Sequence, residues 1–86
     1  MNISFNNNQC VKINNEDEYD QVCHVFRNPR TYKEYSDTYG SLPFPIYLEH
    51  ANSVYSGTTI GWTSRPTSTW GGTPLEVLSI EEATIN

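Results

Sequence analysis

The chain of 86 residues is short of three features, and each shortage excludes a class of protein. Its two cysteines, Cys10 and Cys23, are far too few for a disulfide-rich scaffold, although counting alone leaves open whether they bridge one another. No apolar run approaches the roughly 18 to 20 residues that a membrane span requires, and no basic, apolar leader begins the chain. We therefore expect a cytoplasmic protein without membrane association.

Basic residues are also scarce, because ten acidic side chains against five basic ones give a net charge of −5. Nucleic-acid binders neutralise phosphates with Lys and Arg, so this balance argues against a nucleic-acid partner. It favours instead a protein partner with a basic surface. Mimicry of DNA would need carboxylates spaced along one face, whereas the acidic residues here cluster at 16–20 and 81–82.

The residues that are present suffice for one small globular domain over residues 1–86. A chain of this length buries only about 60 to 65% of its extended surface, so the core is single and thin. Hydrophobic residues make up 36% of the chain and aromatic residues 13%. Because each enclosed aromatic ring buries roughly 150 to 250 Å², these rings can form a large part of that core.

One segment, 14–27, carries a complete helix signature. Its apolar residues recur at i, i+3, i+4 and i+7 and so line one helix face; they are Tyr19, Val22, Cys23 and Phe26. Asn15 is placed to cap the first turn, and Glu18 is placed to complete a capping box. Pro29 prevents the helix from continuing.

Four segments alternate apolar and polar residues or are rich in β-forming residues, which predicts strands. They are 10–13, 46–50, 58–64 and 75–78. Short helical turns are expected at 31–37 and after Ser79, which can form a capping box with Glu82. The predicted fold class is α+β, with one main helix at 15–27 packed on a three- to four-stranded, mainly antiparallel sheet in the order β-α-β-β-β. The expected core residues are Val11, Ile13, Tyr19, Val22, Cys23, Phe26, Ile46, Leu48, Ile60, Trp62 and Val77.

Side chains that could perform chemistry are few. The candidate metal ligands are Cys10, Cys23, His24 and His50. They lack the close pairs, such as C-x2-C or H-x3-H, that zinc sites use. A Cys–His nucleophile is also disfavoured, because one thiol faces the predicted core and the other lies in a strand. Gly71-Gly72 lacks the flanking elements and the Lys of a phosphate-binding loop. We therefore predict a non-enzymatic protein with no metal and no cofactor.

Tyrosine and tryptophan exceed what a thin core can enclose, which indicates a contact surface, since both are enriched at protein interfaces. The predicted partner-binding residues are Tyr32, Tyr35, Tyr39, Tyr55, Arg65 and Trp70. An alternative is that cations and neighbouring rings hold a nucleotide by charge and stacking. The cations in question are Arg27, Arg30, Lys33 and Arg65, and Arg65 with Trp70 would make the main contacts.

Several motifs resemble a group of small tailed-phage accessory proteins. They are Val11-Lys12-Ile13-Asn14 followed by Asn15-Glu16-Asp17-Glu18-Tyr19, then Tyr47-Leu48 after a proline, Ile60-Gly61-Trp62, and Leu78-Ser79-Ile80-Glu81-Glu82. The likeness spans residues 11–82, and the chain departs from the group in its tyrosine-rich segment 30–41 and in the loop that carries Trp70. The resemblance implies a phage accessory role inside the host cell and supplies no catalytic residues.

The residues and the resemblance together predict a non-enzymatic phage protein that binds and inhibits a host protein in the host cytoplasm. Its target would belong to a defence system, which makes it an anti-defence factor such as an anti-CRISPR or anti-restriction protein. Two alternatives stay open: a protein that sequesters a nucleotide or other small ligand and so counters host nucleotide signalling, and a minor virion or assembly component. Assembly into a homo-oligomer is also left open.

Overall fold

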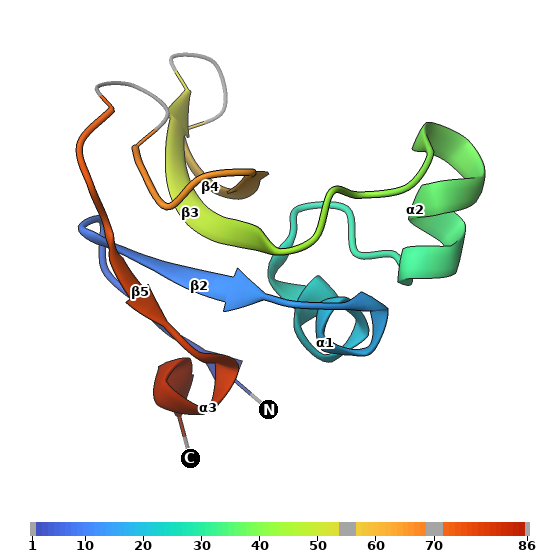
Figure 1. Cartoon of the computed structure of the whole chain (residues 1–86), viewed down its shortest axis with the longest axis horizontal. Coiled ribbons are helices and arrows are strands. Elements are labelled where there is room, and N and C mark those ends of the chain that lie inside the picture. The colour runs from blue at the N-terminus through green and yellow to red at the C-terminus, as the bar shows by residue number, and fades with distance from the viewer. Residues whose placement is uncertain (1, 54–56, 69–71, 86) are drawn as a thin grey trace.

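The computed structural model describes residues 2–53, 57–68 and 72–85, and they form an α+β fold (Figure 1). In chain order its elements are β1 (Asn2–Ile3), β2 (Gln9–Ile13), α1 (Glu16–Val22), the 3₁₀ turn η1 (Cys23–Val25), α2 (Tyr32–Tyr39), β3 (Ile46–Ser53), β4 (Gly57–Thr63), β5 (Glu76–Leu78), α3 (Ile80–Ala83) and β6 (Thr84–Ile85). The predicted α+β class is confirmed.

A four-stranded mixed sheet in the order β4-β3-β2-β5 forms the centre of the fold. Strand β3 runs antiparallel to both of its neighbours, whereas the short edge strand β5 runs parallel to β2. A separate antiparallel pair of β1 and β6 brings the two ends of the chain together, as Figure 1 shows. The helix α2 stands apart from the sheet and is joined to it by the segment 40–45 (Figure 1).

The hydrophobic core lies between one face of this sheet and α1. In the register of β2 and β3, Val11 is opposite Leu48 and Ile13 is opposite Ile46, so all four side chains share one face. All four are 0% exposed. From α1, Tyr19 and Val22 are buried against them, which accounts for half of the predicted apolar stripe.

The remainder of the stripe is only partly buried, because the α-helix ends earlier than the sequence predicts. After Val22 the backbone tightens into η1, in which three residues rather than 3.6 complete a turn. Cys23 and Phe26 therefore pack at the margin of the core instead of inside it. Phe26 lies beyond the turn, in extended backbone.

Two predicted core residues are exposed, which corrects the expectation for both. Trp62 is opposite Leu48 and on the core face, but β4 is the edge of the sheet and 38% of the tryptophan remains accessible. Val77 is opposite Cys10 on the other face and is 43% exposed. On that second face Cys10 and Glu49 are buried, so it is not a uniformly solvated surface.

The helix caps explain where the helices begin. Asn15 accepts a hydrogen bond from the Glu18 backbone N–H (2.9 Å), as predicted, but the Glu18 carboxylate accepts from the Asn14 backbone N–H (3.1 Å) instead of completing the box. The capping box of Ser79 and Glu82 is complete at the start of α3, and this prediction is confirmed.

The second helix is longer than the short turn expected at 31–37. A complete capping box of Thr31 and Glu34 begins α2, and Gly40, with φ of 92°, ends it in a conformation that favours glycine. The first N–H of the helix also donates to an Asp20 carboxylate oxygen at 2.7 Å, which ties α2 to α1. No helix among the described residues is long and apolar enough to cross a membrane.

Candidate functional site: an aromatic groove

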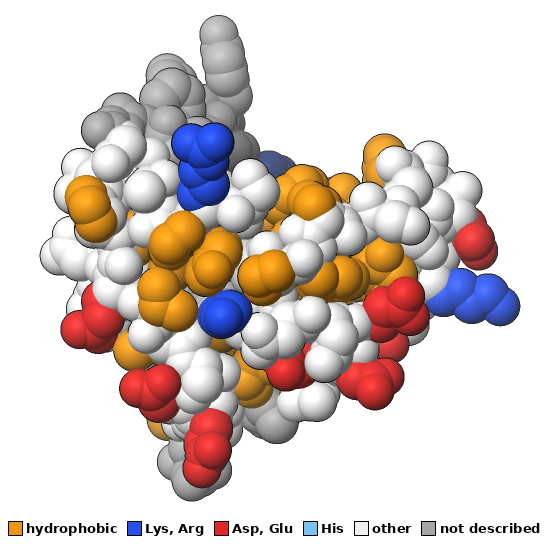
Figure 2. All heavy atoms as spheres, viewed as in Figure 1, with side chains coloured by type: hydrophobic (Ala, Val, Ile, Leu, Met, Phe, Trp, Pro, Cys, Tyr) orange, Lys and Arg blue, Asp and Glu red, His pale blue; other side chains and the backbone are white. Residues whose placement is uncertain are grey.

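An open groove of about 320 Å³ lies where α1, the segment after η1, α2 and the edge strand β4 meet. We call it the aromatic groove, and its lining residues are Tyr19, Phe26, Arg27, Asn28, Arg30, Tyr35, Tyr39 and Trp62. Five of these eight residues are aromatic, and none of the eight carries a carboxylate. Figure 2 shows hydrophobic side chains gathered between the sheet and α2, whereas acidic side chains lie mainly along the lower margin of that face.

The rings of the groove hold one another in place. The Tyr19 ring stacks on Phe26, with their centroids 5.7 Å apart, and also contacts Tyr35 at 6.0 Å. Tyr35 in turn contacts Tyr39 at 5.1 Å. Such pairs stabilise a structure by about 0.5 to 1.5 kcal/mol each beyond the burial of area, so the groove is formed before any ligand arrives.

Two of the rings remain open to solvent. Tyr39 is 64% exposed and Trp62 is 38% exposed, and they belong to different elements that border the same groove. Single exposed apolar residues are ordinary, but exposed rings around a concavity are typical of contact sites. The aromatic groove can therefore accept a large apolar side chain.

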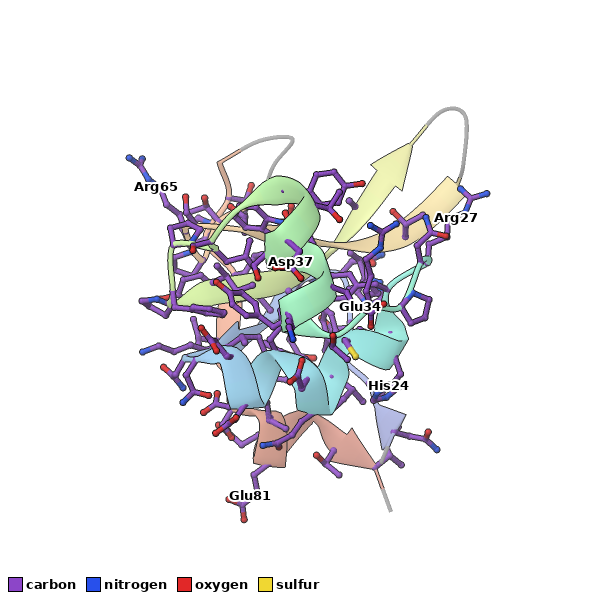
Figure 3. The ribbon with its side chains drawn as sticks, turned by 90° about the vertical axis from the view of Figure 1, so that its right-hand side faces the viewer. His24, Arg27, Glu34, Asp37, Arg65 and Glu81 are labelled. Carbon is purple, nitrogen blue, oxygen red and sulfur yellow. The ribbon has the colours of Figure 1, made fainter. Side chains whose placement is uncertain are left out.

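Two arginines add positive charge to this apolar site. The Arg30 guanidinium lies 5.5 Å from the centroid of the Tyr39 ring, which is within the range of a cation–π contact. Within the described part of the chain, neither Arg27 nor Arg30 forms an ion pair or a hydrogen bond with a carboxylate. Figure 3 shows the Arg27 side chain directed outward, away from Glu34 on α2.

Two carboxylates on the helices that line the groove already have partners. Asp20 accepts from the Tyr32 N–H, and Glu34 accepts from the Thr31 N–H at 3.2 Å and from its hydroxyl at 3.1 Å. Each bond holds a helix cap, so moving either carboxylate toward an arginine would sacrifice a cap. The two arginines are therefore available to an anion from outside.

Burial makes the Tyr19 hydroxyl a weaker acid than that of an ordinary tyrosine. Burial raises the pKa of Tyr19 from its ordinary value of 10.0 to about 12, and the neighbouring Tyr35 and Cys23 act in the same direction while Arg30 opposes them. The hydroxyl therefore stays un-ionised to a higher pH than that of an ordinary tyrosine.

The raised pKa of Tyr19 predicts that the protein loses stability at alkaline pH. Because the folded state holds the Tyr19 proton more tightly than the unfolded state, its contribution to the free energy of unfolding is complete below pH 10 and is lost as pH rises toward 12. Denaturant titrations from pH 8 to 12 should show a steeper decline for the wild type than for Tyr19→Phe. Other titrating groups cancel in this difference, so identical curves would contradict the burial of the hydroxyl.

The structure brings together only some of the predicted partner-binding residues. Tyr35 and Tyr39 line the groove. Tyr32, at 7% exposure, belongs to the core beneath the groove, because its ring contacts both Tyr19 and Phe44, so it does not line the groove with the other two tyrosines. Arg65 is not in the groove and lies on the opposite side of the molecule from Arg27 in Figure 3. The remaining two, Tyr55 and Trp70, lie outside the described residues.

Three of the groove's rings were expected inside the core: Tyr19, Phe26 and Trp62. Strand alternation correctly places Trp62 on the core face, but it cannot indicate that β4 is an edge strand. A usable signal for the site is the set of three cations spaced through residues 27–33, close to tyrosines within and after this segment.

Other candidate sites offer fewer free polar groups. A larger cavity of about 770 Å³ lies between α1 and α3, but its Glu18 and Glu82 carboxylates already accept hydrogen bonds from backbone N–H groups. No three potential metal ligands come together in the described part of the chain. Cys10 and Cys23 are both free thiols, which answers the question of a bridge, and burial raises the pKa of each.

Comparison with known proteins finds no family model, no curated protein sequence and no solved structure that matches this chain. The functional proposal therefore depends on the chemistry of the groove.

Proposed function

We propose that this chain is a non-enzymatic binding protein whose aromatic groove takes an apolar side chain of another protein. The observation that supports this proposal is the pair of exposed rings, Tyr39 and Trp62, on two sides of a preformed aromatic cluster. Tyr, Trp and Arg are the residues most enriched at the energetic centres of protein interfaces, and all three types line this groove.

The lining is better suited to binding than to catalysis. Acid–base or nucleophilic catalysis needs converging groups whose proton affinities suit the reaction. The ionisable side chains that line the groove are tyrosines and arginines, and Tyr19 is held un-ionised at neutral pH. These groups can position and recognise a ligand, but none is poised as a base or a nucleophile.

The resemblance to phage accessory proteins supports a more specific form of the proposal. In that form the partner is a host protein, the complex forms in the host cytoplasm, and occupation of the groove inhibits the partner, as an anti-defence factor does. Nucleotide sequestration is the second candidate, because Arg30 lies beside the Tyr39 ring and could bind a phosphate while the ring stacks on a base.

Matched variants test the binding proposal. Immobilised wild type, Tyr39→Ala, Trp62→Ala and a control, Val77→Ala, are exposed to the same bacterial lysate, and captured proteins are quantified by mass spectrometry. Val77 is also exposed but lies on β5, away from the groove. We expect a specific protein to be retained by wild type and control, and its affinity, measured after purification, to fall at least about tenfold in both groove variants.

Two outcomes would contradict the proposal. One is retention of the same partner at unchanged affinity by both groove variants, since binding would then occur elsewhere. The other is an equal loss in Val77→Ala, which would indicate a general effect on folding. Circular dichroism of all four proteins is needed to show that each keeps its helices and strands.

A further inference from the structure

The aromatic groove differs in charge from the rest of the molecule. The chain carries ten acidic and five basic residues, yet two of the five cations line this one groove, and no acidic side chain among the described residues does. A third cation, Lys33, is exposed on the first turn of α2. The groove therefore carries two positive charges on a chain whose net charge is negative.

The two arginines are suited to carboxylates. A guanidinium can donate two parallel hydrogen bonds to one carboxylate, a geometry that lysine cannot supply. Arg30 is half-buried and held over the Tyr39 ring, so less side-chain entropy is lost when it binds. Arg27 is exposed, and neither arginine has a carboxylate partner within the described residues.

From this arrangement we infer that the groove recognises an acidic segment of a partner protein, in which one aromatic side chain is flanked by Asp or Glu. The inference rests on the proposed function and specifies the partner's chemistry. The ring of the segment packs between Tyr39 and Trp62, and the flanking carboxylates bind Arg27 and Arg30.

The net charge of −5 does not oppose this recognition strongly. Charges further apart than about 8 Å are largely screened at physiological ionic strength, so the nearest groups decide the interaction. The acidic clusters lie at the start of α1 and in α3. Asp20 and Glu34, which lie next in sequence to the groove residues Tyr19 and Tyr35, already accept backbone hydrogen bonds at the start of α2. From its overall charge, the sequence predicts a partner with a basic surface. At the contact itself, however, the proposed groove selects acidic residues of the partner.

Short peptides test the inference directly. Blocked Glu-Glu-Trp-Glu-Glu is titrated into the ¹⁵N-labelled full chain, and so is its uncharged counterpart Gln-Gln-Trp-Gln-Gln. Binding is followed at the Trp62 indole N–H and the Arg27 and Arg30 side-chain N–H signals. We expect the acidic peptide to bind at least about tenfold more tightly, since each charge-assisted hydrogen bond is roughly twice as strong as a neutral one.

Charge variants assign the preference to the two arginines. In the double variant Arg27→Gln with Arg30→Gln, the acidic peptide should bind no more tightly than the uncharged one. Lys33→Gln is the matched control, because Lys33 is a nearby exposed cation that does not line the groove. It should keep the full preference.

The possible failures are distinguishable. Equal binding of the two peptides at the groove would overturn the acidic preference and leave the proposed function standing. Absence of binding by both at millimolar concentration would overturn both statements. Saturable shifts of the same signals with ADP or a cyclic nucleotide, and none with the peptides, would instead identify the groove as a nucleotide site.

Discussion

Replacing Leu48 with alanine is expected to lower the free energy of unfolding by about 2 to 5 kcal/mol, the largest effect among the substitutions considered. Leu48 is 0% exposed and lies opposite Val11 on β2 and Trp62 on β4, at the centre of the sheet. Its loss would leave a cavity that the surrounding strands cannot close. For a domain of this size the melting temperature should fall by about 10 °C or more.

The control for this prediction is Val77→Ala, which removes apolar atoms from a strand residue that is 43% exposed. It should cost less than about 1 kcal/mol, because most of its side chain gains little from burial. Chemical denaturation of both variants measures the difference. If Leu48→Ala proved no more destabilising than Val77→Ala, the core would not lie on this face of the sheet.

The second large effect is expected from Tyr32→Phe, which removes a single oxygen atom. The Tyr32 hydroxyl accepts a hydrogen bond from the Leu42 backbone N–H at 3.1 Å, in a buried setting. Without the hydroxyl, the buried Leu42 amide loses this acceptor, and the free energy of unfolding should fall by about 1 to 3 kcal/mol. This bond also fastens the segment 40–45 to α2, so its loss should loosen the helix that carries Tyr35 and Tyr39.

Two measurements distinguish the loss of this hydrogen bond from a general effect of removing a tyrosine hydroxyl. Tyr39→Phe removes the same atom from a ring on the same helix that is 64% exposed, and should change stability by less than about 0.5 kcal/mol. Hydrogen exchange of the Leu42 amide should accelerate in Tyr32→Phe and stay slow in Tyr39→Phe. An unchanged exchange rate in Tyr32→Phe would mean that the hydroxyl does not protect this amide.

The two predictions connect stability with the candidate site. Asp20 and Tyr32 link α2 to α1 and to the segment that leads into β3. The rings of the groove are thus supported by a small number of hydrogen bonds outside the main core. Weakening these bonds is expected to disturb the groove before the sheet.

Local patterns in the sequence predicted much of the fold. Alternation at 10–13 and 46–50 located β2 and the beginning of β3, and the Ser79 capping box located α3. These features depend on residues close together in the chain, which is why a sequence reveals them. The predicted end of the first helix is wrong, because the sequence pattern does not show where an α-helix tightens into a 3₁₀ turn. In that turn the same apolar residues point in other directions.

The candidate site was harder to predict, since its walls come from segments far apart in the chain. Tyr35 and Tyr39 were identified as surplus rings, but Trp62 joins them only because β4 ends the sheet on the same side as α2. Tyr32 has the same residue type as its neighbours on α2, yet packing against Tyr19 and Phe44 places it in the core. Residue type alone cannot distinguish these two environments.

By itself, the sequence determined the acidic composition, the helix starts and most of the strand patterns, since propensity, capping and periodicity are local properties. Only the tertiary structure decided which rings are enclosed and which remain open. It also decided that Arg27 and Arg30 meet those open rings without a carboxylate partner among the described residues. The physical reason is that burial and charge pairing depend on contacts between distant segments, and only the folded chain sets these contacts.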